Sequence, residues 1–175
     1  MKEWEDFFIT ASQYYVAGRY AAFAAFIPVV GNLFHHAVEM YLKGGLSKKG
    51  HSLNALRAFK HDLLKIWDEF KRTFNDPSLN KFDNTINLLH DFEDLRYPQS
   101  NPPSVIEVLI DIVKQPPIPG RRPTHSLCVQ DLDELVGQIF KTASVNPTAF
   151  LSSRYQNAEA KEYLTKENRV RSLIV

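Results

Sequence analysis

The chain has 175 residues, 44% of them hydrophobic, and its 21 lysines and arginines nearly balance 20 aspartates and glutamates. This length and composition fit one domain with one core, and the balanced charge excludes a general attraction to nucleic acid or to an acidic membrane. The single cysteine, Cys128, excludes an internal disulfide and a cysteine-based structural zinc site. A reducing compartment suits such a chain, so we expect a cytoplasmic protein.

The most apolar stretch runs from Tyr14 to Val30 and contains Gly18, Arg19 and Pro28. It falls short of the roughly 20 apolar residues that a membrane span needs. The acidic residues near the N-terminus also differ from the basic start of a signal peptide. We therefore interpret the stretch as buried helix and expect no membrane association.

Apolar residues recur at three- and four-residue steps along most of the chain, which is the spacing of one helical face. Gly44 and Gly45 indicate a fraying helix end, and Asp131 with Glu134 resembles a capping box. We expect helices over residues 2–25, 28–46, 53–74 with a bend near 59–61, 78–95, 132–143 and 158–166. Because their connections are short, neighbouring helices should be antiparallel. The sequence predicts a mainly α protein, an antiparallel up-and-down bundle of four to five helices.

Two apolar runs flank a proline-rich segment in the second half of the chain. The first, residues 105–113, is rich in β-branched side chains, and the second covers 126–129. They predict a small β-hairpin appended to the bundle, with a short helix over 105–113 as the alternative. The expected single domain thus has a bundle core over about 2–96, a hairpin over about 103–130 and C-terminal helices over about 131–167.

Polar residues that could form a site begin in the second expected helix. Glu39 precedes Lys43 by four residues, a spacing that pairs them on one helical face, either as a surface pair or as a polar patch in a groove or dimer seam. His35 lies four residues before Glu39, so this carboxylate could orient its imidazole. No third ligand accompanies His35 and Glu39, so no metal is expected. Asp62 is expected to cap a helix.

Signatures of common enzymes are absent from the sequence. It has no phosphate-binding glycine loop, no His-Glu-x-x-His helix and no glycine-flanked nucleophilic serine. Cys128 is expected to be buried rather than reactive, and Arg121 with Arg122 could contact a phosphate. Arg96 follows three acidic residues at an expected helix end, where it could complement the helix dipole or take part in function.

Three segments together resemble the HEPN domain (higher eukaryotes and prokaryotes nucleotide-binding). They are Asn-Leu-Phe-His-His-Ala-Val-Glu-Met-Tyr-Leu-Lys-Gly-Gly-Leu over 32–46, Lys-His-Asp-Leu over 60–63 and Leu-Arg-Tyr-Pro over 95–98. In that family, a helix with an Ala-x-Glu-x-x-x-Lys-like run is followed by a His-Asp-Leu-like helix start and an Arg-Tyr-Pro-like helix end. The resemblance covers about residues 11–98.

The resemblance implies a helical bundle that often dimerises. Such bundles occur in RNA-cleaving toxins, in partners of small nucleotidyltransferases and in non-catalytic binding proteins. The ribonucleases carry an arginine and a histidine with four to six residues between them. Here the next histidine after Arg96 is His125, whereas Arg57 and His61, like Arg121 and His125, have only three residues between them. The usual ribonuclease site cannot be assembled.

Three functions remain open. The leading hypothesis is a non-catalytic, HEPN-like homodimer that recognises a nucleotide, RNA or a partner protein such as a nucleotidyltransferase, without a cofactor. Its candidate ligand-binding residues are Glu39, Lys43, His61, Arg96 and Tyr97. One alternative is a ribonuclease or toxin with a displaced site, in which His61 is the general base and Arg96 or Lys43 stabilises phosphate charge. The other is a structural protein-interaction module, which an exposed apolar patch on the hairpin would favour.

Overall fold

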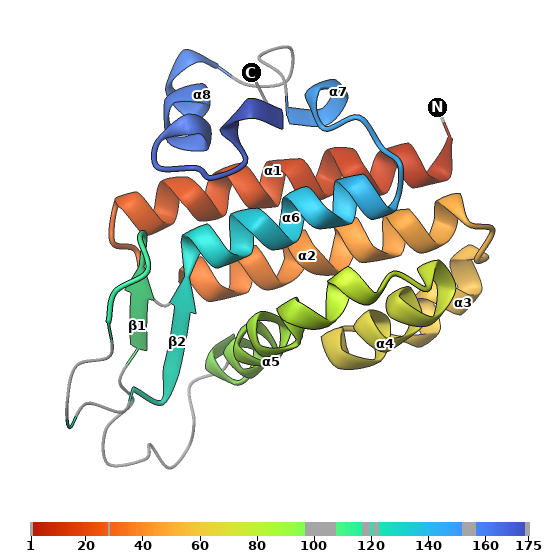
Figure 1. Ribbon diagram of the computed structural model, residues 1–175, viewed down its shortest axis with the longest axis horizontal. Helices are drawn as coiled ribbons and strands as arrows, with labels where there is room; N and C mark the ends of the chain where they lie inside the picture. Colours follow the sequence, from red (N-terminus) through yellow and green to blue (C-terminus); the bar gives the residue numbers. More distant parts are fainter. Residues whose placement is uncertain are drawn as a thin grey trace.

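The computed structural model describes residues 2–27, 29–96, 108–116, 120, 123–151 and 157–173, without the side chains of Asp94 and Arg96. Its described part is a helical bundle with a small two-stranded β element, which confirms the predicted fold class (Figure 1). None of the described helices is both long and apolar enough to cross a membrane.

Helices α1 (Glu3–Phe23) and α2 (Val29–Lys48) form a long antiparallel pair at the centre of the bundle. Three acidic residues lie in the first turn of α1, where their negative charges stabilise the helix by interacting with the positive end of its dipole. The expected fraying at Gly44 and Gly45 is wrong, because α2 continues to Lys48 and both glycines are buried. A Cβ on Gly44 would lie 2.7 Å from the ring of Phe8, so the missing side chain lets the two helices approach closely.

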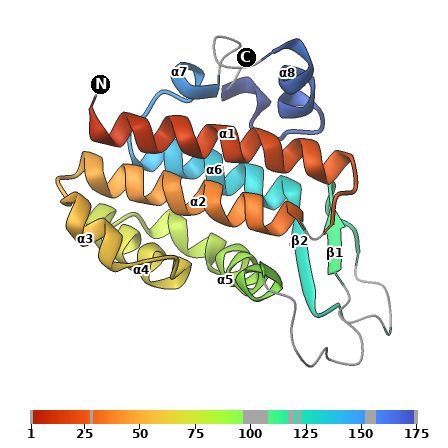
Figure 2. The same cartoon turned by 180° about the vertical axis from the view of Figure 1, so that it is seen from behind.

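The third expected helix is divided where a bend was predicted. Helix α3 (Leu53–Ala58) ends before the turn at residues 59–62, and α4 (Leu63–Phe74) follows it, packing against α2 (Figure 2). The predicted cap is confirmed, since the Asp62 carboxylate accepts a hydrogen bond of 3.1 Å from the Lys65 amide. We call residues 59–62 the α3–α4 turn.

The fourth expected helix is a mixed segment. It comprises the 3₁₀ helix η1 (Pro77–Phe82), the helix α5 (Asp83–Asp91) and the 3₁₀ helix η2 (Phe92–Arg96). Its predicted apolar residues nonetheless face the core, including Leu79, Ile86 and Phe92. The periodicity therefore located the buried face, although the backbone is tighter than an α-helix at both ends.

Helix α6 (Val129–Thr142) lies along α1 and α2 and buries Leu132, Val136 and Phe140 in the same core (Figures 1 and 2). It begins before the expected start, with Cys128 at the N-cap position. The predicted capping box is wrong, because Asp131 already lies in the first turn. Its carboxylate instead lies 3.1 Å from the Lys114 ammonium.

Strands β1 (Val108–Asp111) and β2 (His125–Cys128) pair in parallel, with Val108 opposite His125 and Asp111 opposite Cys128. The predicted hairpin is therefore wrong in its strand direction, and the helical alternative is wrong over the described residues 108–111. A hairpin would pair the end of β1 with the start of β2. Here the connection between the strands is long enough for β2 to start beside the beginning of β1, so both strands run in the same direction. Strand β2 then runs directly into α6.

The C-terminal elements cover the side of α1 that faces away from α2 (Figures 1 and 2). They are α7 (Thr148–Leu151), α8 (Ala158–Thr165) and the 3₁₀ helix η3 (Arg171–Leu173). Leu164 of α8 is fully buried and belongs to the common core. The predicted helix over 158–166 is confirmed, with Asn157 as its cap.

Candidate functional site

Glu39 and Lys43 form an ion pair inside the protein. The Glu39 side chain is fully buried, the Lys43 side chain is nearly so, and Nζ of Lys43 lies 2.6 Å from Oε1 of Glu39. The interpretation of a surface pair is therefore wrong, although the predicted pairing on one helical face is confirmed. Lys43 also donates a 2.7 Å hydrogen bond to the carbonyl oxygen of Lys60, so its ammonium is engaged by two acceptors.

His61 reaches the same carboxylate from the α3–α4 turn. Its Nδ1 lies 3.1 Å from Oε2 of Glu39, while its side chain remains 54% exposed. The structure thus brings together three of the five candidate ligand-binding residues: Glu39, Lys43 and His61. The side chain of Arg96 and all of Tyr97 lie outside the described residues.

His35 has a different role from the one expected. The predicted orientation by Glu39 is wrong, because the ring nitrogens of His35 face the carbonyl oxygens of Leu89 at 3.3 Å and His61 at 3.2 Å. Burial lowers the pKa of His35, so the ring is neutral at physiological pH and donates to one of these carbonyls. His35 therefore hydrogen-bonds α2 to either α5 or the α3–α4 turn and lies against the other.

Two side chains of α2 thus contact successive carbonyl groups of the α3–α4 turn. Lys43 binds the carbonyl of Lys60, and His35 contacts that of His61. Lys60 has a φ angle of +53°, in the left-handed region that is unfavourable for a residue with a side chain. These contacts stabilise the strained turn and direct the His61 ring back toward Glu39.

The charge on Glu39 is maintained by its hydrogen bonds. Burial by itself would raise the pKa of this carboxyl, but hydrogen bonds with His36, Lys43 and His61 together lower it to about 2. Glu39 is consequently an anion at neutral pH, with Lys43 as its buried counter-ion. Such a charge is tolerated in the interior because it is paired with Lys43 and contacted by His36 and His61.

His36 is a further member of this group that the sequence-based interpretation missed. Its Nδ1 lies 3.5 Å from Oε2 of Glu39, and its side chain is 26% exposed. The ring also packs near Tyr14 and His61, with centroid separations of 5.4 Å and 5.8 Å. The signal was available, because His36 precedes Glu39 by three residues and so shares its helical face.

One potential ligand atom from each of His36, Glu39 and His61 lies within 4.8 Å of those of the other two. We call these three residues the His36–Glu39–His61 cluster. Two imidazoles around a carboxylate can share protons in a hydrogen-bonded network, and the same three groups are ligands for a divalent metal ion. The cluster lies at the surface end of a buried charge pair.

Two exposed cations lie beside the cluster in sequence and in space. Arg57 lies in the last turn of α3, and its carbonyl oxygen accepts a hydrogen bond from the amide of Lys60, which places the two residues on one turn of chain. Neither side chain forms an ion pair with any residue in the described ranges. We call Arg57, Lys60 and His61 the cationic corner.

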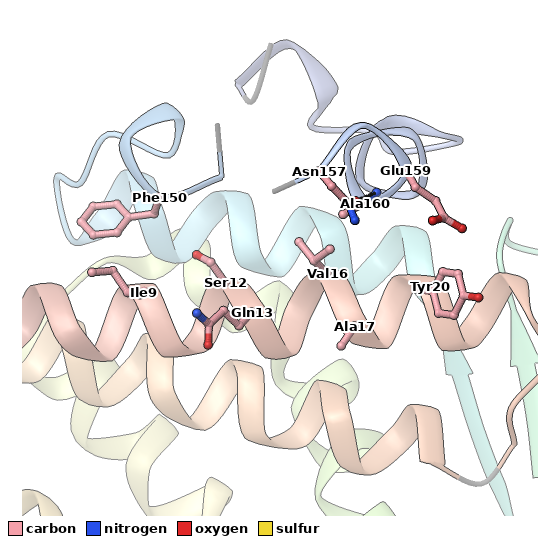
Figure 3. A pocket seen from close by; sticks show the side chains of 10 residues that line it. All are labelled: Ile9, Ser12, Gln13, Val16, Ala17, Tyr20, Phe150, Asn157, Glu159 and Ala160. Atoms are coloured by element: carbon pink, nitrogen blue, oxygen red, sulfur yellow. Dashed lines mark hydrogen bonds between the residues drawn. The ribbon is translucent and has the colours of Figure 1, made fainter. Parts of the chain in front are cut away.

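A separate pocket of about 410 Å³ lies between α1 and the C-terminal helices (Figure 3). Its walls are mainly apolar, and Figure 3 shows Phe150 at one end and Tyr20 at the other. Asn157 is not free to bind a ligand strongly, since its side chain caps α8 through a 2.8 Å hydrogen bond to the Ala160 amide. The pocket offers mainly apolar surface, with the carboxylate of Glu159 on its wall.

A second cavity, of about 720 Å³, lies between α5 and the two strands and includes Cys128. Cys128 is half-buried, and burial raises the pKa of its thiol, which disfavours the reactive thiolate. The expected burial of Cys128 is met only in part, because its side chain is half-buried and lines this cavity.

No family model, curated protein or solved structure matches the chain. The resemblance to the HEPN domain therefore rests on the three sequence segments, and it stays a prediction.

Proposed function

We propose that the protein is a non-catalytic, HEPN-like binding protein that acts in the cytoplasm as a homodimer. In this proposal, the cationic corner recognises the phosphate of a nucleotide or of RNA. The observation that carries the proposal is the fixed α3–α4 turn, whose backbone is bound by Lys43 and contacted by His35 from the interior. The exposed side chains next to this backbone are Arg57, Lys60 and His61.

A fixed turn matters because binding costs less free energy when the backbone of the site is already ordered. Lysine and arginine side chains supply most contacts to nucleic-acid phosphates, and they act without reading the base. Arg57 and Lys60 are exposed, and His61 is half-exposed beside them. Such a corner fits a small number of phosphate groups rather than a long duplex, in agreement with the balanced charge of the whole chain.

The same geometry argues against catalysis. RNA cleavage needs a base near the 2′-hydroxyl and a cation near the phosphate. His61 has the carboxylate partner that a base would use, since its Nδ1 lies 3.1 Å from Glu39. Lys43, however, directs its ammonium into the protein toward Glu39 and the Lys60 carbonyl, so it cannot face a substrate phosphate.

A protein-interaction module is the second candidate, favoured by exposed apolar side chains at the connection between α1 and α2. Phe26 is 56% exposed and Val29 is 52% exposed, with Tyr20 and Ile27 also exposed nearby. Large apolar side chains gathered on a surface are typical of sites that bind another protein. This patch lies on the α1–α2 connection, whereas the sequence-based hypothesis expected one on the hairpin, where Val113 is 37% exposed among the described residues.

Fluorescence anisotropy with labelled single-stranded RNA of mixed sequence, and with a labelled nucleoside triphosphate, tests the first candidate. We expect Arg57→Gln/Lys60→Gln to weaken binding at least tenfold, because two phosphate contacts are lost. Lys141→Gln/Lys161→Gln removes the same charge from exposed positions elsewhere and should leave binding unchanged. Equal losses in both double variants, or no binding by the original protein, would refute phosphate recognition at the cationic corner.

Two further readouts separate the remaining functions. Gel analysis of the same RNA after incubation detects cleavage, and cleavage that His61→Ala abolishes would establish the displaced ribonuclease site instead. Light scattering gives the mass in solution, which we expect to be twice that of the 20.1 kDa chain. A dimer that binds neither RNA nor nucleotide would favour the protein-interaction module.

A further inference from the structure

We propose that His36, Glu39 and His61 form a binding site for one divalent transition-metal ion, with Zn²⁺ as the best match. Two imidazole nitrogens and a carboxylate oxygen are a ligand set that zinc accepts readily. This inference depends only on the geometry of the cluster, and it holds or fails independently of nucleotide or RNA binding.

The measured separations fit a tetrahedral ion. Ligands placed about 2.0–2.1 Å from zinc at tetrahedral angles lie roughly 3.3 Å from one another. In the structure, Oε2 of Glu39 lies 3.5 Å from Nδ1 of His36 and 3.1 Å from Nδ1 of His61. All three ligand atoms lie within 4.8 Å of one another, so a modest rotation of the half-exposed His61 ring completes the arrangement.

The surroundings of Glu39 prepare it as a ligand with one oxygen. Its Oε1 accepts the hydrogen bond from Lys43, which fixes the orientation of the carboxylate and leaves Oε2 directed at the two imidazoles. Metal ligands are commonly oriented by such outer hydrogen bonds. A bound ion would take the place of the protons now shared between Oε2 and the imidazole nitrogens.

The charge of the site indicates what its fourth ligand would be. Lys43 already neutralises Glu39, so a bound Zn²⁺ would leave a local charge of about +2 at a position that His36 and His61 expose to solvent. Three protein ligands with one open position resemble zinc sites that bind a water molecule or an anion, rather than closed structural sites. We therefore infer that the fourth position is open to water or to an anionic ligand.

Isothermal titration of the untagged protein with ZnCl₂, after treatment with a chelator and dialysis, tests the site. We expect one ion per chain, with affinity reduced about 100-fold or more in His61→Ala, since removing even an outer partner of a metal ligand costs about 10–100-fold. His61→Ala changes a largely exposed side chain, so it should leave the fold intact. The visible absorption of Co²⁺ added in place of zinc reports the coordination geometry independently.

His51→Ala is the matched control. Nε2 of His51 lies 2.7 Å from Oε1 of Glu69, so it too is an imidazole bonded to a carboxylate, but no third ligand was found there among the described residues. Zinc binding that survives His51→Ala and is lost in both His36→Ala and His61→Ala supports the proposal. Absence of stoichiometric binding by the original protein, or equal affinity in His61→Ala, overturns it.

Discussion

The guanidinium of Arg19 and the carboxylate of Asp133 form a fully buried ion pair, with Nη1 of Arg19 2.5 Å from Oδ2 of Asp133. This pair joins α1 to α6. Arg19 also donates hydrogen bonds to the carbonyl oxygens of Tyr163 and Lys166, at the C-terminal end of the chain. Tyr15 donates a 2.6 Å hydrogen bond to Asp133, so one buried network links the bundle to α8.

Removing one member of this pair should destabilise the protein strongly. Arg19→Ala and Asp133→Ala each leave a buried charge without its partner, and we expect each to lower the free energy of unfolding by about 3–5 kcal/mol. Urea denaturation followed by circular dichroism measures the loss. Arg19→Met/Asp133→Leu removes both charges and keeps volume, so it should cost less than the two single changes together. A strictly additive double variant would contradict a direct interaction.

Local patterns in the sequence predicted the helices well, because each helix depends on residues a few positions apart. A bend near residues 59–61, where the structure divides the helix in two, was predicted on this basis, as was the cap by Asp62. The partners of Arg19 could not be predicted, since Asp133 is distant in sequence and an arginine in an apolar run signals only that some partner exists. The parallel pairing of the strands was missed for a related reason, because pairing direction depends on the path of the connection.

In the candidate site, too, contacts within one helix could be predicted from the sequence, whereas contacts between distant residues could not. The four-residue spacing predicted the Glu39–Lys43 pair, but burial of the pair depends on how α2 packs in the bundle, which the spacing does not report. His36 was overlooked because it forms a three-residue group only together with Glu39 and His61, and His61 lies on the α3–α4 turn, 25 positions further along the sequence. The HEPN-like segments selected Glu39, Lys43 and His61 as candidates for one site, but their sequence positions could not show that these side chains meet in space.

Replacing Lys60 with glycine should stabilise the protein. Lys60 has a φ angle of +53°, where a side chain costs about 1–2 kcal/mol and glycine costs little. Glycine also gains freedom in the unfolded chain, so we expect a net increase of about 0.5–1 kcal/mol in the free energy of unfolding. Thermal denaturation measures the change. Arg57→Gly, within α3, should instead destabilise by about 1 kcal/mol, and equal signs for the two variants would rule out strain at Lys60.

A side chain at Gly31 should be poorly tolerated. A Cβ built there would lie 1.9 Å from Cδ1 of Phe92, so Gly31→Ala requires α2 and η2 to separate or the ring to move. We expect a loss of about 1–3 kcal/mol in the free energy of unfolding, as is typical for an overpacked core. Phe92→Leu should recover part of this loss when added to Gly31→Ala. A double variant less stable than both single variants would show that the contact is not the cause.

The pH dependence of stability should reveal the connection between η1 and α6. Asp76 accepts hydrogen bonds from the side chains of Ser78, Thr142 and Gln138, and these bonds, with the Ser78 side chain contributing most, lower the pKa of Asp76 below its usual range. A carboxyl with a lowered pKa stabilises the folded state fully above its unfolded pKa. That contribution is lost as the pH falls through the lower folded value.

Asp76→Asn therefore should be less stable than the original protein by about 1 kcal/mol at neutral pH, because asparagine can still cap η1 but lacks the second acceptor oxygen and the charge that strengthen these hydrogen bonds. The difference should remain constant down to about pH 5 and then shrink as Asp76 of the original protein becomes protonated. Urea denaturation at several pH values between about 3 and 7 measures it. Asp68→Asn is the control, because Asp68 is exposed and its contact with Lys71 is 3.9 Å long. A difference for Asp76→Asn that stays constant to pH 3 would mean that the Asp76 charge does not stabilise this connection.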